Sequence, residues 1–316
     1  MTTTFTTPKK QLTWLITGCS SGFGLSLTRI AQAEGDKVIA TSRNPSRTPE
    51  LVREVESKGG KWLQLDLDNP NNAQVIEQLE NSGQEIDVLV NNAGFSIFSP
   101  VETSTEEEYR AQMESMYFGP LRLIRAVLPH MRKRRFGIIV NMSSGAALEG
   151  RDTMGGYAGA KAGLDGTCIF STSILSELKT DAGLVSWTGV TKVMAKEVAP
   201  FNVRTLTVNL GTFNTDMPNA ATFGKNPLPD DYQGSVSAQM IQVIKSGKLP
   251  ILGDKDKAMK AVYEVVVGEG VGAGYEAERF LPLGSDMTPR VKQVQQYLAH
   301  GLEVFGHVTD NVNLDR

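Results

Sequence analysis

A tyrosine and a lysine four positions apart, Tyr157 and Lys161, are the pair in this sequence best suited to acid–base chemistry. On a helix, side chains at this spacing lie on the same face. A tyrosine hydroxyl has a pKa of about 10 and exchanges protons poorly at neutral pH. A neighbouring ammonium lowers that pKa, so the pair predicts proton transfer to a carbonyl oxygen or from an alcohol. The alternative is an ordinary pair on an amphipathic helix.

A glycine-rich turn follows the first predicted strand, and an apolar helical pattern begins directly after it. Glycines let the backbone approach a pyrophosphate closely, and the N-terminus of the following helix offers free N–H groups and a positive dipole. This context predicts a dinucleotide site, with a tight structural turn as the alternative. The candidate binding residues are Thr17, Gly18, Ser20, Ser21, Gly22, Phe23 and Gly24.

The second predicted strand ends at Arg43. An acidic residue at this point would bind the ribose 2′-hydroxyl of NAD, whereas an arginine suits the 2′-phosphate of NADP through a charge-assisted hydrogen bond. We therefore expect NADP as the cofactor. Arg47 is a possible second contact, although solvent exposure is the simpler interpretation.

The elements that must position these residues alternate between short apolar strands and helices. This alternation predicts a doubly wound parallel α/β sheet of Rossmann type, with about seven strands covered on both faces. Ser104 and Glu107 form a predicted capping box at one helix start, and a closing helix is expected over 289–305. The expected strands are Leu12–Thr17, Val38–Ser42, Trp62–Leu65, Val88–Asn91, Ile138–Met142, Val203–Asn209 and Phe280–Leu283.

Taken together, these motifs resemble the classical short-chain dehydrogenase/reductase family over roughly residues 10 to 215. The turn matches the family's Thr-Gly-x-x-x-Gly-x-Gly, Tyr157 to Lys161 its Tyr-x-x-x-Lys, and Ser144 stands thirteen residues before Tyr157. The likeness is to retinol- and 17β-hydroxysteroid-dehydrogenase-like members, many of them fungal. It implies that Ser144, Tyr157 and Lys161 are catalytic, with Ser144 orienting the substrate oxygen and Lys161 also bonding the nicotinamide ribose. Further implied cofactor contacts are Asp66, Leu67, Asn91, Ala93, Gly94 and Thr215.

Two departures from the family pattern stand out. Met116 occupies the position of an asparagine that holds a proton-relay water in the family, and a thioether cannot donate a hydrogen bond. After Lys161 the catalytic helix carries 23 extra residues, 167–189, and removing them restores the helical period of the apolar residues. The block is either a translated intron or a genuine excursion.

Composition limits the possible partners and sites. The net charge is −3 over 316 residues, which gives no basic field for nucleic acid. Two cysteines and three histidines lack metal-ligand spacing, and no apolar run is long enough to span a membrane. We expect a cytoplasmic protein with a flexible tail over 1–10 and a single domain over 11–316, in which 216–316 forms a substrate lid. A homo-oligomer is possible.

The sequence thus predicts an NADP(H)-dependent oxidoreductase that interconverts a ketone or aldehyde and an alcohol on a fairly apolar small molecule, such as a steroid, retinoid, lipid or polyketide of secondary metabolism. The alternative is an NADP-binding protein impaired by Met116 or by the inserted block. An apolar substrate pocket is expected from Phe95, Ile97, Phe98, Phe213, Met217 and Phe223, with ordinary loop packing of these side chains as the alternative.

Overall fold

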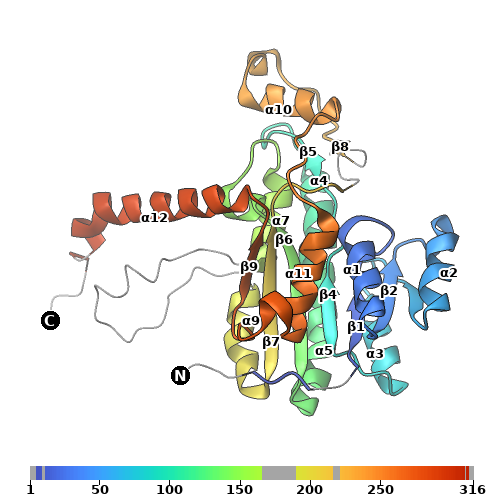
Figure 1. The fold of residues 1–316 in the computed structure, drawn as a ribbon. Helices are drawn as coiled ribbons and strands as arrows, with labels where there is room; N and C mark the ends of the chain where they lie inside the picture. Colours follow the sequence, from blue (N-terminus) through green and yellow to red (C-terminus); the bar gives the residue numbers. More distant parts are fainter. Residues whose placement is uncertain (1–4, 9–10, 166–189, 216–220, 310, 313–316) are drawn as a thin grey trace.

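The computed structural model describes residues 5–8, 11–165, 190–215, 221–309 and 311–312. Its centre is a parallel sheet of seven strands in the order β3-β2-β1-β4-β6-β7-β9, and every neighbouring pair in it is parallel (Figure 1). The predicted fold class is confirmed. The strands are β1 (Thr13–Ile16), β2 (Lys37–Ser42), β3 (Lys61–Gln64), β4 (Val88–Asn91), β6 (Gly137–Ser144), β7 (Val203–Leu210) and β9 (Phe280–Leu283).

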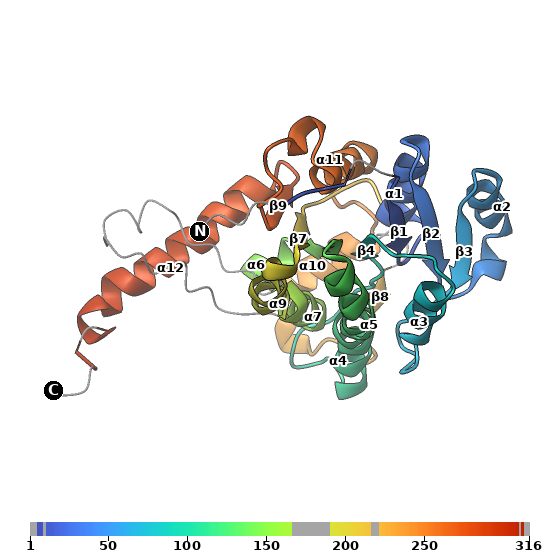
Figure 2. The ribbon, with the colours of Figure 1, turned by 90° about the horizontal axis from the view of Figure 1, so that it is seen from below.

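Helices cover both faces of the sheet, because successive strand residues point to opposite sides. Trp14 and Ile16 pack in the core that lies under three of the helices, and Leu15 packs in the core on the other face. The first face is covered by α1 (Gly22–Ala33), α2 (Pro49–Ser57) and α11 (Lys255–Val267). The second is covered by α3 (Gln74–Asn81), α5 (Gly119–Arg134), α7 (Gly155–Asp165) and α9 (Val190–Val198) (Figure 2).

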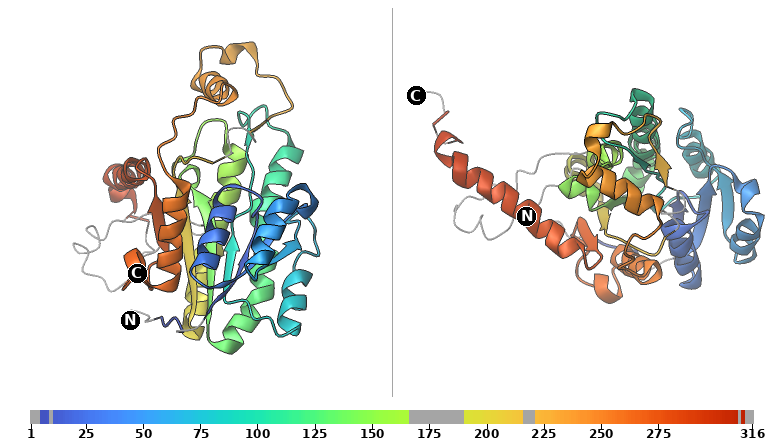
Figure 3. Two further views of the ribbon diagram at one scale, coloured as in Figure 1. Left: turned by 45° about the vertical axis from the view of Figure 1, so that its right-hand side comes forward. Right: turned by 90° about the horizontal axis from the view of Figure 1, so that it is seen from above.

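Further elements lie at the ends of the strands. A two-stranded parallel ribbon pairs β5 (Ile97–Phe98) with β8 (Thr222–Phe223), and α10 (Val236–Lys245) lies beyond it. The long helix α12 (Met287–Thr309) starts beside the sheet and projects away from it (Figure 3). The remaining helices are α4 (Glu106–Met113), α6 (Ala146–Glu149), the π-helical η2 (Glu114–Phe118), and the 3-10 turns η1 (Pro45–Arg47), η3 (Ala199–Phe201), η4 (Asp230–Tyr232) and η5 (Gly270–Gly272).

Two local expectations differ from the structure. The capping box of α4 is one residue further on than predicted: the Thr105 hydroxyl accepts from Glu108 N at 3.2 Å, and the Glu108 carboxylate accepts from Thr105 N at 2.8 Å. Ser104 instead donates to the Pro100 carbonyl. Part of the N-terminal segment expected to be a flexible tail is docked, because Phe5 is buried and Thr6 N donates to Asn202.

The predicted block 167–189 lies outside the described residues, but the two helices beside it are informative. Helix α7 ends at Asp165 and α9 begins at Val190, and the two lie end to end in Figures 1 and 2. The Thr191 hydroxyl donates to the Leu164 carbonyl at 2.5 Å across this junction. Without the 23 residues Thr191 would follow Leu164 by four, which is the usual spacing for a threonine bonding back along its own helix. The flanking helices therefore keep the register of one continuous helix.

Candidate active site

The predicted site residues gather at one edge of the sheet, where the parallel strands end. The chain leaves β1 and β4 in opposite directions across the sheet order, and ligands of open α/β sheets bind in the crevice at such a switch point. The glycine turn follows β1, Arg43 follows β2, Asp66 lies just after β3, and Asn91 ends β4. Ser144 ends β6.

The glycine turn is joined to the end of β4 by the Thr17 hydroxyl and by the Asn92 side chain, whose amide donates to the Thr17 and Gly18 carbonyls. Thr17 Oγ1 accepts from the backbone N–H groups of Asn92, at 2.9 Å, and Ala93, at 3.1 Å. Gly18 has φ +72°, and a Cβ there would lie 2.9 Å from the Ala93 Cα. A Cβ at Gly24 would collide with the Gly18 carbonyl and with the Asn92 amide nitrogen. The turn can therefore only be built with glycine at these two positions.

The start of α1 fits a cofactor phosphate. Ser21 is extended and its side chain makes no capping hydrogen bond, and no acidic residue stands in the first turn. The first N–H groups of the helix are thus left for a ligand, where the helix dipole favours an anion. Ser20 and Ser21 are exposed beside them, and Gly22 has φ +56°. The residues present fit the predicted dinucleotide.

Arg43 follows β2, and Asp66 and Leu67 follow β3. Arg43 is exposed, and its carbonyl accepts from Gln64. Asp66 caps the following turn by accepting from Asp68 N at 3.1 Å, and Leu67 is buried with its carbonyl bound by Arg122. Arg43 therefore has its charge at the surface beside the predicted adenosine end of the site.

Gly94 separates the cofactor side of the site from Lys161. A Cβ at this position would lie 3.0 Å from Met116 Sδ and 3.5 Å from Lys161 Nζ. Met116 is fully buried in the π-helical turn η2, and its sulfur and Lys161 Nζ both lie beside Gly94. Ser115, its neighbour, hydrogen-bonds Asp68 instead. The structure thus places the Met116 thioether near Lys161.

Ser144, Tyr157 and Lys161 come together from β6 and α7. The Ser144 hydroxyl is hydrogen-bonded to the Tyr157 phenol, and it also accepts from Ala146 N at 3.2 Å. Lys161 is buried, donates to the Met142 carbonyl at 2.6 Å, and lies 6.0 Å from the Tyr157 ring centre. The predicted trio is therefore assembled at one point of the sheet edge.

The predicted effect of Lys161 on the acidity of Tyr157 is wrong in this structure. Burial raises the pKa of Tyr157 to about 12, with Ser144 opposing the rise through its hydrogen bond and Asp165 adding to it. The lysine does not offset the rise, because its ammonium points to the Met142 carbonyl. Burial also lowers the pKa of Lys161. Tyr157 consequently holds its proton at neutral pH.

A buried polar cluster behind α7 was missed by the sequence reasoning. Asp165 is buried on α7, hydrogen-bonded to Ser143, and burial raises its pKa. Asn141 accepts from Asn91 at 2.8 Å and donates to Thr191 at 2.8 Å. A polar residue inside an otherwise apolar strand, as Asn141 is, was the available signal.

The loop after β7 is held from the C-terminal part of the chain. Thr212 donates both its N–H and its hydroxyl to Asp286, at 3.1 Å each to Oδ2. Thr215, the predicted carboxamide contact, lies three residues further on, and its N–H donates to the Phe213 carbonyl at 2.8 Å. Asp286 was also missed, although an acidic residue just past the end of the predicted strand at 280–283 was a usable signal.

Only part of the predicted apolar pocket forms. The rings of Phe98 and Phe223 lie 6.1 Å apart and pack with Met154, beside Tyr157. Phe213 instead packs on Phe23 of the glycine turn, at 5.4 Å. Met217 lies outside the described residues. The apolar surface near the tyrosine therefore comes from the β5–β8 ribbon.

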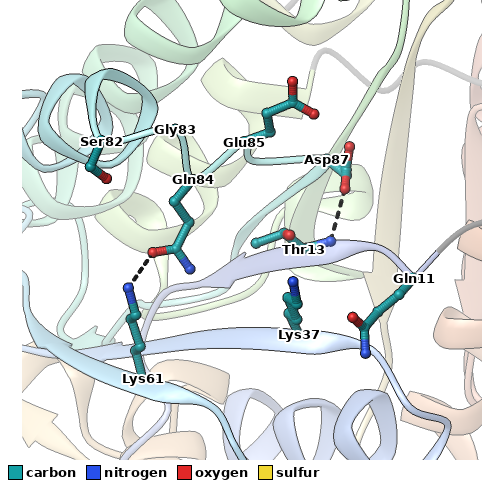
Figure 4. A pocket seen from close by; sticks show the side chains of 9 residues that line it. All are labelled: Gln11, Thr13, Lys37, Lys61, Ser82, Gly83, Gln84, Glu85 and Asp87. Atoms are coloured by element: carbon teal, nitrogen blue, oxygen red, sulfur yellow. Dashed lines mark hydrogen bonds between the residues drawn. The ribbon is translucent and has the colours of Figure 1, made fainter.

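Two cavities flank the fold. One of about 570 Å³ lies at the amino ends of the strands, opposite the site, where Lys61 donates to Gln84 and Thr13 N donates to Asp87 (Figure 4). The other, about 450 Å³, adjoins the segment before Tyr157 and includes Val101, Arg151 and Tyr232 in its lining. Over the described ranges, no cluster of side chains could hold a metal ion, and no helix has the length and apolarity needed to cross a membrane.

Comparison with known proteins agrees with this geometry. Residues 13–182 match the family described as short chain dehydrogenase. The oxidoreductase claN of Passalora fulva, a relative, is 33% identical over 66% of this chain and 85% of its own length. The 3-ketodihydrosphingosine reductase of Bacteroides thetaiotaomicron is 34% identical over 64% of each. A crystal structure of a short-chain dehydrogenase from Streptomyces avermitilis superposes with a TM-score of 0.77 at 28% identity, covering 97% of this chain and all of that one.

Proposed function

The chain belongs to the short-chain dehydrogenase family of oxidoreductases, and from that premise we propose that it uses NADP(H) to interconvert a ketone or aldehyde and an alcohol on a fairly apolar small molecule. The proposal rests on one observation: the side chains of Ser144, Tyr157 and Lys161 lie together beside the glycine turn. The proposed cofactor contacts are Thr17, Gly18, Ser20, Ser21, Gly22, Phe23, Gly24, Arg43, Asp66, Leu67, Asn91, Ala93, Gly94, Tyr157, Lys161 and Thr215.

The three side chains have distinct proposed tasks. When bound, NADPH supplies the hydride that reduces the carbonyl carbon. Tyr157 gives its proton to the carbonyl oxygen, so the product is an alcohol and the phenol becomes a phenolate. Ser144 hydrogen-bonds the same oxygen and orients it. Lys161, whose ammonium is held by the Met142 carbonyl, is proposed to bind the nicotinamide ribose. Tyr157 is protonated at neutral pH, so it carries the proton that carbonyl reduction needs.

The apolar substrate is inferred from the surface next to Tyr157. Phe98, Phe223 and Met154 form this surface, and binding pockets for small molecules are lined mainly by such side chains with a few polar groups. A relative named for a long-chain keto substrate, the 3-ketodihydrosphingosine reductase, is consistent with a lipid-like carbonyl compound. The whole of residues 11–316 is proposed to act as one domain. Of the expected lid over 216–316, as far as the structure describes it, only the part with β8 and α10 lies near the substrate side, because α11 and β9 belong to the body of the fold and α12 projects from it.

The test is oxidation of NADPH and NADH by the purified protein against a panel of ketones and aldehydes of increasing chain length. We expect NADPH to be consumed, faster with longer apolar carbonyl compounds than with short polar ones. Binding of NADPH without turnover of any compound in the panel would contradict the proposal. A preference for NADH would contradict only the choice of cofactor.

A further inference from the structure

The start of α12 lies against two loops of the site. Asp286 accepts from Thr212 N and Thr212 Oγ1, in the loop after β7. Arg290, one helical turn later, donates to Asp286 at 2.7 Å and forms an ion pair with Glu149 at 3.1 Å. Glu149 belongs to α6, which begins two residues after Ser144. One arginine thus joins the loop that follows the catalytic serine to the loop that leads to Thr215.

The contacts are close and shielded from water. The Arg290 side chain is 10% exposed, and those of Asp286 and Glu149 are 14% and 16% exposed. A Cβ at Gly145 would lie 2.6 Å from Arg290 Nη1, and a Cβ at Gly211 would collide with the Asp286 carboxylate. Each segment therefore has a glycine, Gly145 or Gly211, where a charged side chain of the C-terminal segment contacts its backbone.

The cluster contains charges of both signs. Arg151, the fourth member, is attracted by Glu149, Asp286 and Asp152 and repelled by Arg290. Each cation thus has carboxylates beside it, which is the condition under which a buried ionic group can persist. Removing one partner leaves an uncompensated charge, so each residue of the cluster holds the others in position.

We infer that Asp286 and Arg290 are positioning residues for the reaction: they hold the Gly211–Thr215 loop in place for the nicotinamide end of the cofactor, and hold the Gly145–Glu149 segment, which contains α6, in place beside Ser144. This inference rests on the proposed function. It makes the first turn of α12 part of the catalytic apparatus, whereas the rest of that helix is largely exposed and projects from the domain.

The binding test compares a whole cofactor with a fragment. Asp286→Asn keeps the size of the side chain and removes its charge, so NADP⁺ should bind about 10- to 100-fold more weakly, the range expected for loss of charged hydrogen bonds. Adenosine 2′,5′-bisphosphate, which lacks the nicotinamide end, should bind within twofold of the unaltered protein. Glu303→Gln, an exposed carboxylate on the same helix, is the matched control and should change neither affinity.

A second measurement is independent of the cofactor. By hydrogen exchange of the backbone amides, Asp286→Asn should raise exchange in 211–215, Glu149→Gln in 145–149, and Arg290→Met in both segments, while the glycine turn stays unchanged. Arg290→Lys should restore part of the protection.

Each result has a separate meaning. Equal loss of NADP⁺ and fragment binding in Asp286→Asn, or unchanged NADP⁺ binding with unchanged exchange, overturns the positioning role. If the unaltered protein binds neither NADP⁺ nor the fragment, the proposed function fails, and the exchange pattern alone decides whether α12 holds the two loops.

Discussion

The two sides of the active edge hold their loops by different means. Between β1 and β4, the glycine turn is joined to Asn92 and Ala93 through the Thr17 hydroxyl and through close backbone packing. Between β6, β7 and β9, the loops are joined by charged side chains, with Asp286 and Arg290 reaching Thr212 and Glu149. The side between β1 and β4 depends on close packing at glycines. The side between β6, β7 and β9 depends on ion pairs between residues far apart in the sequence.

This difference predicts how each side tolerates change. The backbone around these glycines is packed too closely to accept the methyl group that a substitution to alanine adds. That group would meet main-chain atoms, which cannot move without shifting a strand. Ion pairs between long side chains can be weakened by degrees, and their loss leaves the strands in place. Substitution of the packed glycines should therefore abolish cofactor binding, whereas substitution of Tyr157 should reduce turnover more than binding.

The largest separation should come from Tyr157→Phe. Loss of the phenol proton should lower kcat for carbonyl reduction by about 10²- to 10⁴-fold, the usual contribution of a positioned acid. NADP⁺ affinity should fall by less than about tenfold, because the ring still fills its place. Tyr297→Phe, at a tyrosine that is 77% exposed, is the control and should leave kcat unchanged. A kcat for Tyr157→Phe within tenfold of the unaltered protein would show that another group donates the proton.

The next largest effect should come from Gly24→Ala on the cofactor side. The added Cβ meets the Gly18 carbonyl and the Asn92 amide, so the turn must open and NADP⁺ affinity should fall by at least about 100-fold. Gly301→Ala is the matched control, since a Cβ there meets nothing within 4 Å, and it should raise stability slightly. Titration of NADP⁺ by fluorescence measures both, and tight binding by Gly24→Ala would refute the packing argument.

The contrast between local packing at strand ends and long-range ion pairs explains which features could be predicted from the sequence. All seven strands of the main sheet were predicted within two residues at each end, and strand-end motifs put Arg43, Asn91 and Ser144 at the correct edge. These signals are local, because each motif directly follows the strand that positions it. Asp286 stands 74 residues from Thr212, and no local pattern records that contact. The shift of the capping box by one residue shows that two adjacent hydroxyls at a helix start cannot be ranked without the surrounding loop.

A deletion tests the continuity of the catalytic helix. Closing a connection of n residues costs about (3/2)RT ln n of chain entropy, roughly 3 kcal/mol for 23 residues. Removing 167–189 should therefore raise the free energy of unfolding by roughly 2–3 kcal/mol, measured by urea titration, and leave Tyr157 and Lys161 able to act. Transcripts across codons 160–195 are the companion measurement: a dominant message without codons 167–189 supports the intron hypothesis, and a message that always contains them contradicts it.

The control for this deletion differs by one residue. Removing 167–188 instead leaves one extra residue in the joined helix and rotates α9 by about 100°. Thr191 then cannot reach the Leu164 carbonyl, and the buried face of α9 turns from the core. We expect this variant to be less stable than the 23-residue deletion. Equal stability of the two would show that α7 and α9 do not share one register.

The smallest effect should be at Arg43, which is exposed and contributes through charge alone. Arg43→Ala should lower the preference for NADPH over NADH by about tenfold, because a charged hydrogen bond at the surface contributes less than a buried one. The loss should shrink at high salt, which screens exposed charges. Arg47→Ala, also exposed and four residues later, should leave the preference within twofold. If Arg43→Ala kept its preference while Arg47→Ala lost it, the 2′-phosphate contact would move to η1. The contrast with Gly24 would then still hold. A steric clash at Gly24 abolishes cofactor binding, whereas loss of an exposed charge only weakens it.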